Sequence, residues 1–128
     1  MSVPTDRRYS ETHEWYKLEG DAVTLGITQF AADELTDITY IELAKEGARV
    51  EAGKPCGELE SVKATSELYC AVSGVVIARN AGLADHPELV NQDAFGAGWM
   101  LKIRLSDASA LSSLMDADRY EGHIAAGS

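Results

Sequence analysis

The β-prone segments of this chain are all short, and turn-forming residues separate most of them after a few positions. Runs rich in β-branched and aromatic residues cover residues 14–18, 22–27, 38–43, 56–61, 65–72, 75–78 and 98–105. Short runs of this kind, bounded by glycine, proline or acidic residues, predict strands. Many short strands in one chain are typical of a barrel or a sandwich, so the sequence predicts a mostly β fold.

Two local signals refine the first third of the chain. Glu19-Gly20-Asp21 separates the first two predicted strands and predicts a hairpin between them. Thr28 can then cap a short helix that continues to Leu35. Gly47, Gly53 and Pro55 are expected to form the next turns.

The C-terminal third contains one clear helical pattern. Residues 82–92 are expected to form a loop with at most one helical turn. Ser106 can cap a helix that ends near Gly122, and three apolar residues recur in it at helical spacing: Leu111, Leu114 and Met115. These residues and Met100 are expected to be core.

The length of 128 residues suits a single domain over residues 1–128. No linker or low-complexity tract divides the chain. The expected core runs from about residue 8 to residue 121. Residues 122–128 are small and polar, and we expect them to form a flexible tail.

Charge and hydropathy exclude several classes of partner. The formal net charge is −10, from 21 acidic and 11 basic residues, which disfavours binding to nucleic acid or to an anionic membrane. No apolar run is long enough to span a bilayer. Residues 1–8 lack the apolar segment of a secretory signal. A bacterial cytoplasm is the expected location, and a mature mitochondrial protein without its presequence remains open.

Lys63 lies between two predicted strands, in the stretch Glu-Ser-Val-Lys-Ala-Thr-Ser-Glu over residues 60–67. A tight turn centred on Lys63 would pair Glu60 with Ser66 and Leu59 with Glu67, and would expose the ε-amine. A lone lysine on a turn is usually a solvated charge. The flanking glycines favour a specific role for Lys63 over a merely solvated charge, because Gly53 precedes it by ten residues and Gly74 follows it by eleven.

Glycines spaced almost evenly about one lysine suit two similar β-layers that meet at that lysine. A rigid hairpin that presents a single amine is a shape that a modifying ligase could recognise. With no catalytic constellation elsewhere, the sequence predicts a carrier and not an enzyme. His13, His86 and His123 are scattered and predict no metal site.

Residues 60–64, Glu-Ser-Val-Lys-Ala, resemble the lipoyl-attachment motif of the glycine cleavage system H protein family. Matching segments follow in the family's order, with coverage from about residue 9 to residue 120: 13–15, 26–28, 41–43, 73–74, 88–91 and 98–103. Biotin carriers typically have methionine on both sides of the lysine, and lipoyl domains of 2-oxo acid dehydrogenases have Asp-Lys-Ala. Here Val62 and Ala64 stand in place of the two methionines, and Val62 replaces the Asp of the second pattern.

The resemblance implies a barrel-sandwich hybrid of the lipoyl/biotinyl carrier type, with short helices and a C-terminal helix. It implies lipoate attached covalently through Lys63, placed there by a lipoate ligase or an octanoyltransferase. The carrier would receive the aminomethyl group of glycine from the pyridoxal-phosphate-dependent glycine decarboxylase (P protein). It would pass that group to the tetrahydrofolate-dependent aminomethyltransferase (T protein), and dihydrolipoyl dehydrogenase (L protein) would reoxidise the dithiol.

The resemblance also suggests roles for residues near Lys63. Glu14 and Glu67 are expected to hold the cationic amine of the loaded arm, although exposed carboxylates are usually only solvated. Glu60, Val62 and Ala64 are expected to form the ligase recognition site. A structural role of Glu60 on a strand edge remains open.

Three alternatives remain open at this stage. The chain could be an octanoyl or lipoyl relay in lipoate assembly, with the same attachment lysine. It could be an unmodified interaction module that keeps only the fold. Cys56 and Cys70 each lie seven residues from Lys63, so a regular hairpin would make them neighbours. Two reduced thiols in the core are favoured over a disulfide.

Overall fold

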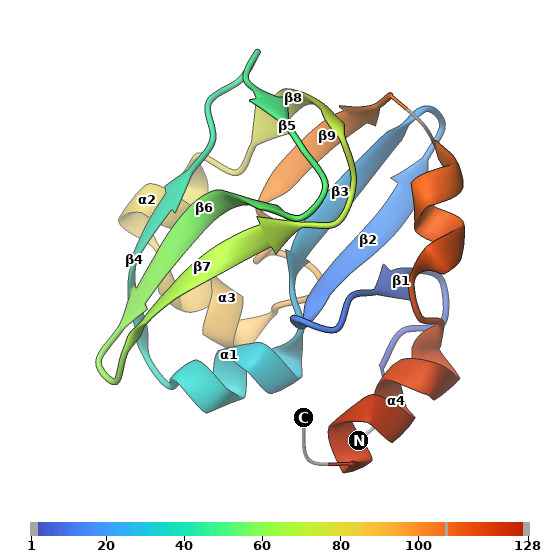
Figure 1. Ribbon diagram of the computed structural model, residues 1–128. Coiled ribbons are helices and arrows are strands. Elements are labelled where there is room, and N and C mark those ends of the chain that lie inside the picture. Colours follow the sequence, from blue (N-terminus) through green and yellow to red (C-terminus); the bar gives the residue numbers. More distant parts are fainter. Residues whose placement is uncertain (1–2, 107, 127–128) are drawn as a thin grey trace.

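The structure, a computed structural model, describes residues 3–106 and 108–126. These residues form two β-sheets that face each other (Figure 1). The larger sheet has the strand order β1-β2-β3-β9-β8-β5, and the smaller has the order β4-β6-β7. The strands are β1 (Arg8–Tyr9), β2 (Glu14–Glu19), β3 (Ala22–Ile27), β4 (Ile38–Leu43), β5 (Arg49–Val50), β6 (Lys54–Ser61), β7 (Thr65–Cys70), β8 (Gly74–Arg79) and β9 (Leu101–Leu105). The mostly β prediction is confirmed.

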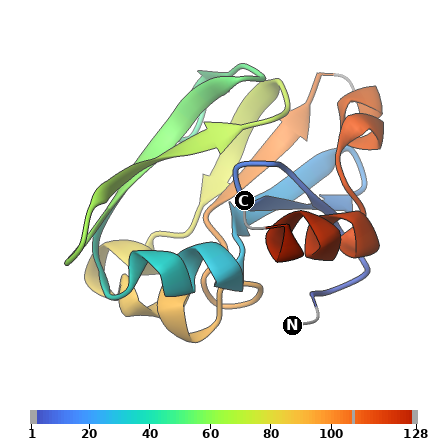
Figure 2. The same ribbon diagram turned by 60° about the horizontal axis from the view of Figure 1, so that its bottom comes forward.

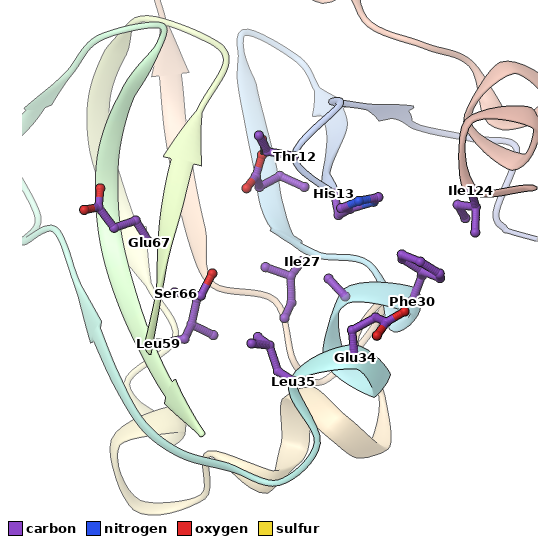
Figure 3. A pocket seen from close by; sticks show the side chains of 12 residues that line it. Thr12, His13, Ile27, Phe30, Glu34, Leu35, Leu59, Ser66, Glu67 and Ile124 are labelled. Carbon is purple, nitrogen blue, oxygen red and sulfur yellow. Dashed lines mark hydrogen bonds between the residues drawn. The ribbon is translucent and has the colours of Figure 1, made fainter. Parts of the chain in front are cut away.

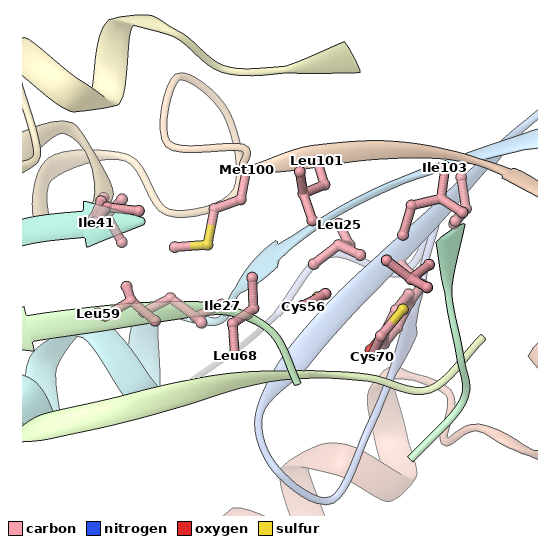
Figure 4. Packing of buried hydrophobic residues seen from close by; sticks show 14 of the residues in the cluster. Leu25, Ile27, Ile41, Cys56, Leu59, Leu68, Cys70, Met100, Leu101 and Ile103 are labelled. Carbon is pink, nitrogen blue, oxygen red and sulfur yellow. The ribbon is translucent and has the colours of Figure 1, made fainter. Parts of the chain in front are cut away.

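The main hydrophobic core fills the space between the two sheets (Figure 4). Leu25, Leu101 and Ile103 of the larger sheet are fully buried, as are Leu59 and Leu68 of the smaller one. Removing these side chains from water is the main driving force that holds the two sheets together.

Three short helices close one end of the sandwich: α1 (Gln29–Leu35), α2 (Gly82–Asp85) and α3 (Glu88–Gln92). In Figure 1, α1 and α3 lie toward the bottom and α2 lies at the left, beside β4. The predicted helix after Thr28 is confirmed, because the Thr28 side chain accepts a hydrogen bond from the Ala31 N–H. The expected loop over residues 82–92 is wrong, since most of it is helical. Helices this short need tertiary contacts to form, and buried Leu83 and Val90 supply them.

The predicted continuous helix from Ser106 to Gly122 is also wrong. A 3-10 helix spans Ala108–Ser113, and Met115 then exchanges two backbone hydrogen bonds with Tyr9. This extended bridge interrupts the helix, and Asp116 begins a new one, α4 (Ala117–Ala125). The Asp116 side chain accepts a hydrogen bond from the Arg119 N–H at 2.9 Å.

Gly122 lies inside α4 and does not end it. The flexible tail was predicted for residues 122–128. Residues 122–125 are instead part of the helix, and residues 127–128 lie outside the described residues. The flexibility of the tail stays a prediction.

A second, smaller hydrophobic cluster attaches α4 to the outer side of the larger sheet (Figure 2). The rings of Tyr9 and Tyr120 stack with centroids 4.7 Å apart, and Trp15 and Ala117 are buried beside them. The cluster fixes α4 next to β1 and the start of β2.

The two cysteines are both buried and free, which confirms the favoured prediction of reduced thiols. The register is not that of a regular hairpin, because β6 is irregular between Pro55 and Gly57 and Lys54 is the partner of Cys70. Pro55 accordingly lies inside β6 and not in a turn. The pKa of the Cys56 thiol is raised by its hydrogen bond with Cys70 and by burial.

Candidate functional site

Lys63 lies in the turn that joins β6 to β7, and its side chain is exposed. The Ser61 N–H donates to the Ala64 carbonyl at 2.9 Å, so Val62 and Lys63 are the two central residues of the turn. The Ser61 hydroxyl oxygen accepts hydrogen bonds from the Lys63 and Ala64 N–H groups, each at 3.1 Å. A serine at this position thus fixes the local geometry of the lysine backbone.

The Lys63 turn also contacts the loop between α1 and β4. The Val62 N–H donates to the Asp37 carbonyl at 3.0 Å, and Lys63 Nζ donates to the Glu34 carbonyl at 3.1 Å. The exposed ε-amine that we predicted is therefore accessible, yet it lies against the C-terminal end of α1.

The hairpin register differs by one residue from the predicted one. Glu60 pairs with Thr65 and Leu59 pairs with Ser66. A one-residue shift moves each side chain to the opposite face of the strand. Ser66 consequently faces inward with Leu59, while Glu67 lies opposite Glu58 on the outer face.

A cavity of about 560 Å³ lies between α1, β7, the start of β2 and the end of α4, and we call it the Glu14 cavity (Figure 3). Its lining is half apolar and half polar, and the polar residues come from the β2 side, from α1 and from β7. It is lined by Thr12, His13, Glu14, Ile27, Phe30, Ala31, Glu34, Leu35, Leu59, Ser66, Glu67 and Ile124. Glu34, whose carbonyl contacts Lys63 Nζ, belongs to this lining.

Glu14 is buried, with only 2% of its surface exposed. Its carboxylate accepts hydrogen bonds from the Ser10 hydroxyl at 2.6 Å and from the Thr12 hydroxyl. Burial raises the pKa of Glu14 to about 7, although these hydrogen bonds oppose the shift. The carboxylate of Glu14 is therefore buried and hydrogen-bonded, and not exposed and solvated.

Glu67 lies at the rim of the cavity, but its carboxylate points away from it, whereas Ser66 points inward (Figure 3). The structure thus separates the two carboxylates that we expected to act together. Glu60, Val62 and Ala64 are all exposed around Lys63, and Val62 is 69% exposed. Their side chains are accessible to a modifying enzyme.

Tyr120 connects three elements that surround the Glu14 cavity. Its hydroxyl lies 2.7 Å from the His13 Nδ1 and 2.7 Å from the Thr28 hydroxyl. Thr28 is the residue that caps α1, and His13 precedes Glu14 in the chain. Tyr120 therefore holds α4 and α1 in fixed positions relative to the start of β2.

The sequence interpretation missed the residues that support and enclose Glu14. Ser10 and Thr12 alternate with Glu14, and this polar alternation at a strand start was an available signal. Phe30 and Ile124 come from α1 and α4, and a single sequence has no signal that brings these two helices together.

No group of His, Cys, Asp and Glu side chains within residues 3–106 and 108–126 is arranged to hold a metal ion. None of the helices in that part of the chain has the length and apolar character needed to cross a membrane.

The sequence model of the family described as "Glycine cleavage H-protein" matches residues 7–126. The glycine cleavage system H proteins of Bacillus mycoides (strain KBAB4) and Bacillus anthracis (strain A0248) are each 52% identical over 120 residues, which cover 94% of this chain and 94% of theirs. A crystal structure of a glycine cleavage system H protein from Mycobacterium marinum superposes with a TM-score of 0.89 at 34% identity, covering 96% of this chain and 99% of that one. The chain therefore belongs to the glycine cleavage H-protein family, and it is a non-catalytic lipoyl carrier of the glycine cleavage system.

Proposed function

We propose that lipoate is attached to Lys63 and that the Glu14 cavity receives the end of the attached arm. One observation carries the proposal: an exposed lysine, fixed in a tight turn, contacts a residue that lines a cavity with a buried carboxylate. A rigid turn presents one amine to an attaching enzyme at little cost in conformational entropy.

The residues of the cavity fit a lipoyl group. Its aliphatic chain and dithiolane ring are apolar, and Ile27, Phe30, Leu35 and Leu59 offer an apolar wall. The volume of about 560 Å³ lies within the usual range for sites that bind small organic groups. When bound, the lipoyl group supplies a disulfide that can accept the aminomethyl group of glycine.

Glu14 is the residue that we assign to the amine of the cargo. Its carboxylate is ionised when a cation is close, because a nearby opposite charge favours the charged form. Ser10 and Thr12 hold the carboxylate in place by their hydrogen bonds. Glu67 could contribute only if its side chain turned toward the cavity, so we expect a smaller contribution from it.

Four partner enzymes follow from this proposal. A lipoate ligase or an octanoyltransferase would attach the group, with Glu60, Val62 and Ala64 as its recognition site around Lys63. Glycine decarboxylase, aminomethyltransferase and dihydrolipoyl dehydrogenase would then act on the carrier in turn. We place these reactions in the bacterial cytoplasm, since the similar Bacillus proteins are bacterial.

Intact-mass spectrometry of protein from lipoate-supplied cells tests the attachment. We expect a single lipoyl adduct that is lost in Lys63→Arg, which keeps the charge but cannot be acylated in the same way. Lys54→Arg is the matched control, because Lys54 is an exposed lysine at the opposite end of β6. An adduct that survives in Lys63→Arg would overturn the assignment.

Cargo transfer is tested separately with the purified glycine cleavage enzymes. Modified protein should support glycine-dependent formation of methylene-tetrahydrofolate, and Lys63→Arg should not. Attachment without any such transfer would contradict the proposed exchange with these three enzymes.

A further inference from the structure

The Lys63 turn rests on the corner between α1 and β4, residues 34–38. The Asp37 carbonyl accepts the Val62 N–H at 3.0 Å, and the Glu34 carbonyl accepts Lys63 Nζ at 3.1 Å. At the same corner, Ile38 is the β4 partner of Ser61, the residue that begins the turn. The backbone of this corner therefore determines where the attachment lysine lies.

The corner has a conformation that its own residues do not favour. Thr36 has a φ of 61° and a ψ of −149°, a backbone conformation that residues other than glycine rarely adopt. A β-branched residue there persists only when neighbouring groups hold it.

Asn91 of α3 supplies that support. Its Nδ2 donates to the Thr36 carbonyl at 2.7 Å and to the Ala32 carbonyl at 3.3 Å. Its Oδ1 accepts the Ile38 N–H at 3.0 Å. Both polar atoms of the side chain thus bond to the backbone on the two sides of Thr36.

We propose that Asn91 is a positioning residue for the acylation of Lys63, and that it acts by holding the α1–β4 corner on which the Lys63 turn rests. The inference rests on the proposed attachment of lipoate to Lys63. The attaching enzyme must bind the turn in one geometry. A turn that is already held in that geometry loses less entropy on binding.

The test measures the rate at which purified, unmodified protein is acylated by a lipoate ligase supplied with lipoate and ATP, followed by intact mass. We expect Asn91→Ala to lower kcat/KM by about fivefold to tenfold, because the variant loses all three side-chain hydrogen bonds that support the corner beneath the turn. Most of the change should be in KM, because the reacting amine itself is unaltered.

Asn80→Ala is the matched control. The Asn80 side chain also donates to two backbone carbonyls, those of Ala97 and Trp99, each at 2.9 Å. These carbonyls lie in another loop that does not contact the Lys63 turn. We expect this variant to lose a similar amount of stability and to be acylated at the rate of the original protein.

Hydrogen exchange gives a readout that does not depend on the ligase. The Val62 amide should exchange faster in Asn91→Ala than in Asn80→Ala, because its acceptor on Asp37 is no longer fixed. If Asn91→Ala does not fold, Asn91→Asp replaces it. That variant keeps the shape of the side chain and its acceptor for Ile38 but loses both donors.

The outcomes separate this inference from the proposed function. If the unaltered protein is not acylated at Lys63, the proposed attachment fails. If Lys63 is acylated but the Asn91 and Asn80 variants react at equal rates, the attachment stands and the role of Asn91 is overturned.

Discussion

Leu59 and Ser66 lie directly opposite each other in the β6–β7 hairpin, and both side chains face the Glu14 cavity. Because neighbouring residues of a strand point to opposite faces, this pairing places Glu67 on the outer face. On the β7 side, the Ser66 hydroxyl therefore faces the cavity, whereas Glu67 lies at its rim with its carboxylate pointing away.

This arrangement predicts different effects for the two carboxylates on the amine-loaded carrier. Glu14→Gln should shorten the lifetime of the loaded form by about tenfold or more, since a charge-assisted hydrogen bond to the cargo is lost. Glu67→Gln is the control, with a much smaller effect. Lifetimes can be followed by mass spectrometry after loading with glycine decarboxylase. Equal lifetimes in the two variants would contradict the assignment of Glu14.

The raised pKa of Glu14 predicts a dependence of stability on pH. The folded pKa of about 7 exceeds the ordinary value of 4.5, so the folded state binds the proton more tightly than the unfolded state. This contribution is fully present below pH 4.5 and is lost as the pH rises through 7.

Glu14→Gln, which stays neutral, should therefore gain stability relative to the unsubstituted protein between pH 5 and pH 8, by up to about 3 kcal/mol. Urea unfolding of both unmodified proteins at several pH values measures the difference. A difference that does not change with pH would show that the buried carboxyl titrates normally.

The Tyr120 hydroxyl is predicted to contribute to stability through its two contacts with His13 and Thr28. Tyr120→Phe leaves the buried Thr28 hydroxyl without this partner, and the free energy of unfolding should fall by about 1–2 kcal/mol. Tyr40→Phe removes a hydroxyl that is bonded to Glu42 on the exposed outer face. It should change stability by less than about 0.5 kcal/mol. Similar losses in both variants would argue against the buried bridge.

Two glycines should respond in opposite ways to alanine. A Cβ on Gly74 would lie 2.0 Å from the Arg104 carbonyl oxygen, so Gly74→Ala must displace β8 from β9 and destabilise the fold. Gly122 lies inside α4 with nothing within 4 Å of an added Cβ. Gly122→Ala should stabilise the protein by about 0.5–1 kcal/mol, because alanine favours the helix. Thermal unfolding of both variants tests this contrast.

Local signals in the sequence predicted the elements that depend on local interactions. The β2–β3 hairpin followed from Gly20, which has a φ of 68° in its turn, and α1 followed from its Thr28 cap. Elements that depend on distant contacts were missed or misjudged. β1 and β5 have only two residues each, and Met115 leaves its helical pattern to pair with Tyr9.

The same division applies to the candidate site. Lys63 was identified from its own neighbours and from a family motif. The orientation of Glu67 was not predicted, because the turn has two central residues, Val62 and Lys63, and its register is one residue away from that of a turn centred on Lys63. The cavity itself is built by side chains from separate elements, so no local pattern could have revealed it.

Because of the position of β9, the larger sheet cannot be completed until the end of β9 has been synthesised. β9 lies between β3 and β8, although both of those strands precede it in the chain. Until residue 105 leaves the ribosome, β3 and β8 each present an unpaired edge. Exposed edges of this kind promote aggregation. Only the pairing of β9 with β3 and β8 covers these two edges. We therefore expect chains truncated before Leu101 to aggregate.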